Sequence, residues 1–240
     1  MKKAFEYLKR ALAPRLCILC ARPVSYLRDM PICDYCKMHW IDQLDLLCPV
    51  CGYESEYCTC TAKHLFGKID FVAFCVFYKS GYGNPANNIV YKLKRDYNGQ
   101  VIDFCAEQMK RKTVKEFAKQ NLSYKDYTVT FPPRRSDGYY EFGYDHAQLL
   151  AESYAKRLGL PVQKCFKNVG KAEQKTISKN ERIQNALKSF VPLNDIDAKD
   201  KKFILIDDVL TTGATLNACA TLLLRMGAKS VVSVCFAKDI

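Results

Sequence analysis

The sequence predicts an α/β protein with a mainly parallel, doubly wound sheet, preceded by a cysteine-rich module. Strand-like and helix-like segments alternate after residue 60, which is the pattern of parallel sheets joined by helical crossovers. Residues 203–206 are a short apolar run, typical of a parallel strand covered on both faces. Eight of the 13 cysteines lie between residues 17 and 60 in close pairs. We therefore expect two parts, residues 1–64 and residues 65–240.

The individual elements are predicted from apolar spacing and from cap residues. Strands are expected at residues 68–78, 127–131, 162–166, 203–206 and 230–236. Helices are expected at residues 85–95, 101–120, 144–158 and 216–226. Asn84 followed by Pro85 is a typical helix start, and Gly159 is a typical helix end.

Composition indicates a folded protein outside the membrane. Hydrophobic residues make up 49% of the chain, which is enough for a sizeable core. No apolar run approaches the roughly 18 residues of a membrane helix, and the charged N-terminal stretch lacks a signal-peptide core. We therefore expect a cytoplasmic protein without a membrane span. Close cysteine pairs in such a protein indicate metal ligation rather than disulfides.

The net charge of +12 is concentrated after the cysteine-rich part. Residues 1–60 hold 8 Lys and Arg against 7 Asp and Glu, so residues 61–240 carry +11. Such an excess favours polyanions such as nucleic acid or polyphosphorylated small molecules. A solvated face that only aids solubility is the other interpretation of the same charge.

The paired cysteines supply the ligands for two structural zinc ions. Eight thiolates are the number needed for two tetrahedral sites of four cysteines each. The eight residues are Cys17, Cys20, Cys33, Cys36, Cys48, Cys51, Cys58 and Cys60. Sequential pairing, with the first four in one site, is favoured, and an interleaved pairing stays open. The short stretches between pairs leave little room for a core, so the module is expected to depend on metal for folding.

Residues 203–215, FILIDDVLTTGAT, combine an apolar strand, an acidic pair and a hydroxyl-rich turn before a helix. Asp207 and Asp208 are expected at the exposed end of the strand, the edge at which open α/β sheets bind ligands. The turn brings backbone N–H groups and hydroxyls to a helix N-terminus, which suits a phosphate. Its residues are Thr211, Thr212, Gly213, Ala214 and Thr215. The stretch therefore predicts a site for a phosphorylated sugar.

All 13 of these positions resemble the phosphoribosyl-pyrophosphate (PRPP) signature of type I phosphoribosyltransferases. The resemblance implies that the turn holds the 5′-phosphate of PRPP, that Asp207 and Asp208 hold the ribose and take part in catalysis, and that Mg²⁺ binds with PRPP. In that family an earlier strand ends in a loop that holds pyrophosphate. Arg134 and Arg135 stand at the corresponding place, and Arg donates paired N–H groups to phosphate oxygens. An ordinary basic loop after a proline turn is the alternative.

Over nearly all 240 residues the chain resembles the ComF family, which joins a double zinc ribbon to a phosphoribosyltransferase-like domain. Residues 142–146, FGYDH, and residues 174–185 also carry this resemblance. It implies single-stranded DNA as a partner in natural transformation, together with DNA-uptake proteins. The residues expected to contact DNA are Lys94, Arg95, Lys110, Arg111 and Lys115. Phe142 departs from the family, which often carries Arg there. His146 replaces a common Gln, and with Asp145 it can hydrogen-bond locally rather than act in chemistry.

Two functions stay open on the sequence. A ComF-like protein binds DNA and uses PRPP as a ligand or as a substrate. A metabolic phosphoribosyltransferase instead makes a nucleotide from PRPP and a free base in salvage, with purely structural zinc ribbons. Only the first function requires the basic helices to contact nucleic acid, and the sequence does not decide whether transfer occurs. Residues 171–185 are interpreted either as a mobile loop that closes over PRPP or as a solvated connector.

Overall fold

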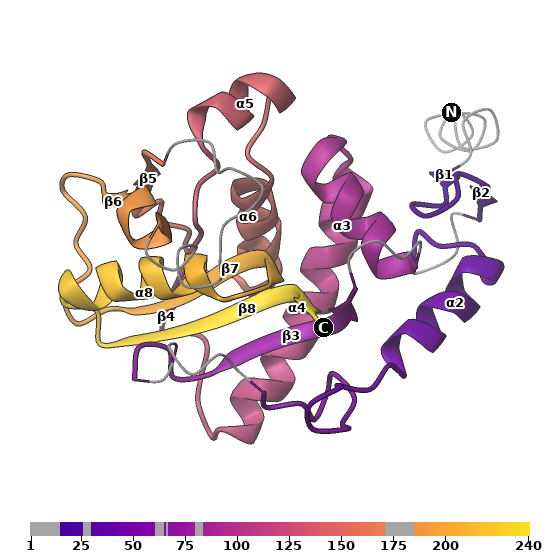
Figure 1. Cartoon of the computed structure of the whole chain (residues 1–240), viewed down its shortest axis with the longest axis horizontal. Coiled ribbons are helices and arrows are strands. Elements are labelled where there is room, and N and C mark those ends of the chain that lie inside the picture. Colours follow the sequence, from indigo (N-terminus) through magenta and orange to yellow (C-terminus); the bar gives the residue numbers. More distant parts are fainter. Residues whose placement is uncertain (1–14, 26–29, 61–64, 66, 80–83, 171–184) are drawn as a thin grey trace, which may run out of the picture.

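A four-stranded parallel sheet forms the centre of the protein in the computed structural model (Figure 1). The structure describes residues 15–25, 30–60, 65, 67–79, 84–170 and 185–240. The strand order is β3 (Val72–Tyr78), β8 (Ser230–Asp239), β7 (Lys202–Leu210) and β4 (Tyr127–Thr130), and each neighbouring pair is parallel. The predicted parallel sheet is confirmed, and four of the five predicted strands belong to it.

Both faces of the sheet are covered because its central strands are apolar on both sides. In β7, Ile204 and Ile206 pack into one core, whereas Phe203 and Leu205 pack into the other. The first core also contains α3 (Pro85–Arg95), α4 (Gly99–Lys119) and α6 (His146–Leu158), and the second contains α8 (Ala214–Arg225). This is the doubly wound arrangement that the apolar run predicts.

Helix starts follow from cap residues. The Asn84 side chain accepts a hydrogen bond from the backbone N–H of Asn87 at 2.9 Å, as the Asn-Pro pattern predicts. Asp145 caps α6 in the same way, accepting from the N–H of Ala147 at 3.0 Å. At the other end of α6, Gly159 has a φ of +69°, a left-handed value that favours glycine.

Two predicted elements differ in the structure. The strand predicted at residues 162–166 is reduced to one parallel bridge between Val162 and Val129 of β4. The regular strand β5 (Phe166–Asn168) begins at its last residue and pairs antiparallel with β6 (Phe190–Pro192) outside the main sheet. The helix predicted at residues 144–158 begins at His146, and a short additional helix, α5 (Ser136–Phe142), precedes it. The αL conformation of Gly143, with a φ of +74°, separates these two helices.

The cysteine-rich part packs onto the sheet, with the chain's tryptophan at the contact. This part contains β1 (Arg15–Leu16), which pairs antiparallel with β2 (Pro23–Val24), and α2 (Asp34–Leu44). Trp40 of α2 is 3% exposed, and its ring centroid lies 5.2 Å from that of Phe104 and 6.1 Å from that of Phe236. The module therefore shares a core with α4 and β8. The division at residues 64 and 65 stays a prediction, because residues 61–64 lie outside the described residues.

Candidate functional site

The acidic pair lies inside a strand. Asp207 and Asp208 belong to β7, which runs on to Leu210. Asp208 is 4% exposed and Asp207 is partly buried. Asp208 Oδ1 accepts a hydrogen bond from the N–H of Val209 at 2.8 Å, and Asp207 Oδ1 accepts from the N–H of Asp208 at 2.9 Å. The prediction of an exposed strand end was wrong, because β8 continues beside β7 and pairs with it as far as Leu210.

Two basic side chains from other elements meet Asp208. Lys94 Nζ, in the last turn of α3, lies 3.1 Å from Asp208 Oδ2. His146 Nε2, at the start of α6, lies 3.4 Å from the same oxygen. The side chains of Asp208 and His146 are 6% and 14% exposed, whereas that of Lys94 is 44% exposed. Lys94, which the sequence analysis assigned to DNA binding, therefore lies in the acidic site.

His146 is a site residue that the sequence analysis missed. Its neighbour Asp145 does form the expected local hydrogen bonds as the cap of α6. His146 itself reaches the acidic pair, because α6 begins at the carboxyl side of β4 and β4 lies next to β7. The topology could have predicted the position of His146, because helices that follow parallel strands begin at the ligand-binding edge of the sheet.

The two carboxylates have opposite electrostatic environments. Burial and the neighbouring charge of Asp208 raise the pKa of Asp207 to about 8. Burial also disfavours the charged form of Asp208, but the Lys94 ammonium and His146 outweigh it and hold the pKa of Asp208 well below its usual value. Asp208 in turn raises the pKa of Lys94. Near neutral pH the pair therefore holds one ionised carboxylate, Asp208, beside a protonated or titrating Asp207.

The threonine-rich turn joins β7 to α8 beside the acidic pair. Gly213 has a φ of +75°, which favours glycine, and α8 begins at the next residue. Thr212 Oγ1 accepts a hydrogen bond from the N–H of Ala214 at 3.3 Å. Thr211 is exposed, and Thr212 and Thr215 are partly exposed. The turn thus presents hydroxyls and the positive end of a 12-residue helix, an arrangement that suits an anion.

Arg134 and Arg135 differ in what they contact. The Arg134 guanidinium donates from Nη1 to the carbonyl oxygen of Tyr144 at 3.2 Å and from Nη2 to the carbonyl oxygen of Lys94 at 2.6 Å. Arg135 Nη2 lies 3.3 Å from Asp137 Oδ2, and its side chain is 32% exposed. Both arginines follow β4, as predicted, and Arg134 ties the loop to the end of α3.

The eight predicted cysteine ligands form two groups of four. The groups are Cys17, Cys20, Cys33 and Cys36, and Cys48, Cys51, Cys58 and Cys60. In each group all four Sγ atoms lie within 4.8 Å of one another. The sulfurs of Cys20 and Cys33 are 3.6 Å apart, close to the roughly 3.8 Å edge of a tetrahedron with Zn–S bonds of about 2.3 Å. The grouping is the sequential one, and each group can bind one zinc ion.

Comparison with known proteins identifies the family to which the chain belongs. The phosphoribosyl transferase domain model matches residues 145–240, which contain the acidic pair and the threonine-rich turn. DNA utilization protein YhgH of Salmonella typhimurium is 25% identical over 232 residues, covering 95% of this chain and 98% of the relative. Competence protein ComFC of Streptococcus pneumoniae is 31% identical over 144 residues, covering 56% of this chain and 62% of that protein. The chain belongs to the ComF family of phosphoribosyltransferase-like proteins.

A further relative matches about half of this ComF-family protein. Adenine phosphoribosyltransferase of Mycobacterium marinum is 30% identical over 131 residues, covering 48% of this chain and 71% of that enzyme.

Across the part of the chain that the structure describes, no helix is both long and apolar enough to cross a membrane.

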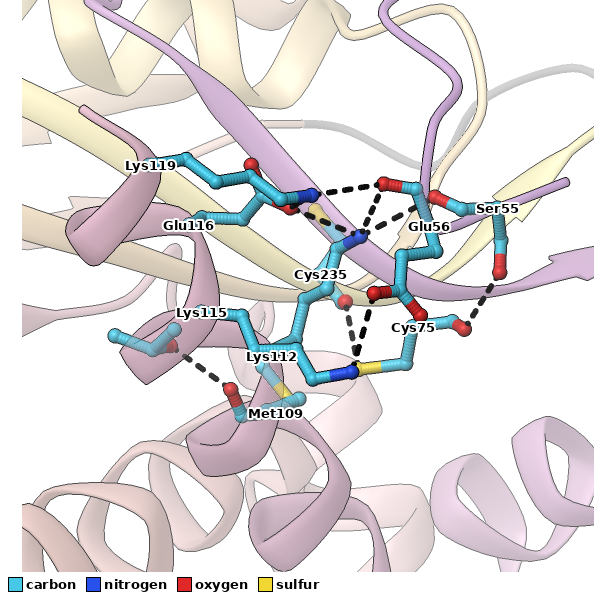
Figure 2. A network of polar contacts seen from close by, with 10 residues as sticks. Ser55, Glu56, Cys75, Met109, Lys112, Lys115, Glu116, Lys119 and Cys235 are labelled. Carbon is cyan, nitrogen blue, oxygen red and sulfur yellow. Dashed lines mark hydrogen bonds and ion pairs between the residues drawn. The ribbon is translucent and has the colours of Figure 1, made fainter. Parts of the chain in front are cut away.

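In this ComF-family protein, lysines of α4 contact the loop of the second cysteine group (Figure 2). Lys112 Nζ donates to the carbonyl oxygens of Ser55 at 3.3 Å and Glu56 at 3.2 Å, and Lys119 Nζ donates to that of Glu56 at 3.3 Å. Lys115 Nζ lies 3.1 Å from Glu56 Oε1. Of these three lysines, Lys115 was predicted to contact DNA, and it pairs with the cysteine-rich module instead.

The other residues predicted to contact DNA lie near the surface. The side chains of Lys110 and Arg111 are 37% and 61% exposed, and both pair with Glu107, at 3.8 Å and 3.1 Å. Arg95 is exposed, and its guanidinium carbon lies 5.3 Å from the ring centroid of Tyr91, which is itself 58% exposed. The structure therefore does not gather the five predicted residues on one free basic face.

Proposed function

We propose that this protein binds PRPP together with Mg²⁺ at the end of β7. One observation carries the proposal: the acidic pair, two basic side chains and a helix N-terminus lie together at the end of β7, and all of them except Lys94 belong to the segment that matches the phosphoribosyl transferase domain. Helix N-termini suit phosphates, and carboxylates suit sugar hydroxyls. The residues proposed to bind PRPP are Arg135, Asp207, Asp208, Thr211, Thr212, Gly213, Ala214 and Thr215.

Different residues of the chain bind different parts of PRPP. The hydroxyls of the turn and the first N–H groups of α8 hold the 5′-phosphate. Asp207, which is partly exposed, accepts hydrogen bonds from the ribose hydroxyls in its ionised form. Mg²⁺ would neutralise the pyrophosphate charge while keeping some of its own waters. In a transfer reaction the acidic pair would stabilise the positive charge that develops at the anomeric carbon as pyrophosphate leaves.

We also propose single-stranded DNA as a partner. Two relatives are named as a DNA utilization protein and a competence protein, and the net charge of this chain is +12. Arg95 with exposed Tyr91 offers both a positive charge and a ring on which a base can stack. The ion pairs of Lys110 and Arg111 are at the surface, where such pairs contribute about 0–1 kcal/mol, so DNA phosphates can compete for these side chains.

A metabolic transferase is the second candidate, and one observation favours it. The chain is 30% identical over 131 residues to a protein named adenine phosphoribosyltransferase. This candidate requires a free base as acceptor and requires no nucleic acid.

Calorimetry with PRPP, with and without Mg²⁺, tests the binding site. We expect Mg²⁺-dependent binding that Asp207→Asn weakens and that the exposed Lys156→Gln, on the far end of α6, leaves unchanged. The absence of any PRPP binding would contradict the proposed site. Pyrophosphate release is followed in the same samples with a single-stranded oligonucleotide or adenine. Release with adenine and no affinity for the oligonucleotide at low salt would favour the metabolic enzyme.

A further inference from the structure

The guanidinium of Arg134 already makes hydrogen bonds within the protein. Its two terminal nitrogens donate to the carbonyl oxygens of Tyr144 and Lys94, at 3.2 Å and 2.6 Å. Its guanidinium carbon lies 4.5 Å from the ring centroid of Phe142, which covers one face of the group. An incoming phosphate would have to displace these contacts to gain the paired N–H groups that make Arg effective. Arg134 is therefore better placed to hold the end of α3 than to bind an anion.

The hydrogen bond from Arg134 determines the position of Lys94, which is itself a cation. Its backbone carbonyl receives the 2.6 Å hydrogen bond from Arg134, and its ammonium lies 3.1 Å from Asp208. An ammonium has three N–H donors, and among the described residues this one has a single carboxylate, Asp208, within 4.0 Å. The side chain is 44% exposed, so an anion can reach it from solvent.

Asp208 can release Lys94 without being left as an unpaired buried charge. His146 Nε2 lies 3.4 Å from the same carboxylate oxygen, and the N–H of Val209 donates to the other oxygen at 2.8 Å. An unpaired buried carboxylate would oppose such an exchange strongly, whereas a carboxylate with two remaining partners opposes it less. Lys94, Asp208 and His146 are thus arranged so that Lys94 can leave Asp208 for another anion.

We propose that Lys94 is the side chain that binds the pyrophosphate group of PRPP, moving from Asp208 to the anion, and that Arg134 positions Lys94 through its backbone carbonyl. This inference rests on the proposed function. It reverses the roles expected from the sequence, in which Arg134 binds the anion and Lys94 binds DNA. The alternative is that Lys94 serves only as a fixed counter-ion of Asp208.

Calorimetry on the full chain separates these roles with two probes, inorganic pyrophosphate with Mg²⁺ and ribose 5-phosphate. Lys94→Gln retains an N–H donor toward Asp208, so it tests the charge while preserving a partner for the carboxylate. We expect at least a 10-fold loss of pyrophosphate affinity and less than a 2-fold change for ribose 5-phosphate, on the basis that one charge-assisted contact is worth about 1.4 kcal/mol or more. Lys156→Gln, the matched control, should change neither.

The positioning role of Arg134 is tested by a double-mutant cycle. Arg134→Lys keeps the charge but loses the fork that holds both carbonyls. We expect it to weaken pyrophosphate binding when Lys94 is present and to cause no further loss in the Lys94→Gln background. Additive losses would show that Arg134 binds the anion itself and would overturn the proposed roles. Unchanged pyrophosphate affinity in Lys94→Gln would also overturn them, whereas a native protein that binds neither probe nor PRPP would overturn the proposed function itself.

Discussion

Lys94 and Asp208 join helix α3 to strand β7 through an ion pair of 3.1 Å between Nζ and Oδ2. His146 approaches the same oxygen from α6 at 3.4 Å. Three elements that are distant in sequence thus meet at one buried carboxylate. Because this carboxylate belongs to the predicted PRPP signature, a change there is expected to affect folding and ligand binding together.

Replacing Asp208 by Asn should destabilise the protein, because it removes the counter-charge of the Lys94 ammonium. Breaking a fully buried pair costs about 3–5 kcal/mol. Lys94 is 44% exposed, so we expect a smaller loss of about 2 kcal/mol in the free energy of unfolding. Urea unfolding near neutral pH measures it. Asp207→Asn is the matched control and should cost less than about 1 kcal/mol, because a carboxyl group with a raised pKa gains little from being charged. Equal losses in the two variants would contradict this account.

The raised pKa of Asp207 predicts how PRPP affinity depends on pH. The folded-state pKa of about 8 lies above the usual value of about 3.9, so the folded protein retains this proton longer than the unfolded chain. The contribution of Asp207 to stability therefore falls as the pH rises from about 4 to about 8. Its ionised form is the better acceptor for ribose hydroxyls, so PRPP affinity should increase between about pH 7 and pH 9. Calorimetry across this range checks it, and Asp207→Asn should remove the dependence. A flat profile in the unmodified protein would argue against Asp207 as a ribose contact.

Each chain should contain two zinc ions, and removing them should detach the cysteine-rich module from the sheet. Trp40 is the single tryptophan of the chain and is 3% exposed, so its fluorescence reports on this contact. A chelator should shift the emission to longer wavelength as the ring becomes exposed. Cys20→Ser should lower the zinc content toward one per chain, whereas Cys75→Ser, outside both groups, should leave it at two. A folded protein that is purified without chelator and contains no zinc would contradict the metal assignment.

The parts of the fold that were predicted correctly are those encoded by neighbouring residues. The apolar run in β7, the paired cysteines and the caps at Asn84 and Gly159 each carry their signal within a few positions. The burial of Asp208 depends instead on β8, which pairs with β7 beyond the apolar run. No local pattern in the sequence records that pairing.

Charge patterns showed where basic residues lie but not what they contact. Lys115 was assigned to DNA from its helix, yet its partner Glu56 lies in the zinc module, far away in the sequence. Lys94 was grouped with Arg95 as a neighbour, but successive residues of a helix point in different directions. One of them reaches Asp208 and the other lies over Tyr91. Partners of this kind follow from the packing of elements, which the sequence pattern does not specify.

Single-stranded DNA binding should depend on salt and on surface cations, but not on Lys94. Each phosphate neutralised on a single strand contributes about −0.7 to the slope of log affinity against log salt concentration. Substituting Arg95, Lys110 and Arg111 by Gln should flatten this slope, because their side chains are exposed or only loosely paired. Adding Lys115→Gln should change it less, because Glu56 already neutralises that side chain.

Fluorescence anisotropy with a labelled oligonucleotide at several salt concentrations measures these slopes. Lys94→Gln is the discriminating variant in this series, since its ammonium faces Asp208 at 3.1 Å. It should reduce pyrophosphate binding while leaving the DNA slope unchanged. A slope that falls as much in Lys94→Gln as in the Arg95 variant would place Lys94 on the DNA-binding surface after all. No binding of the oligonucleotide even at low salt would remove DNA as a partner and favour the metabolic transferase.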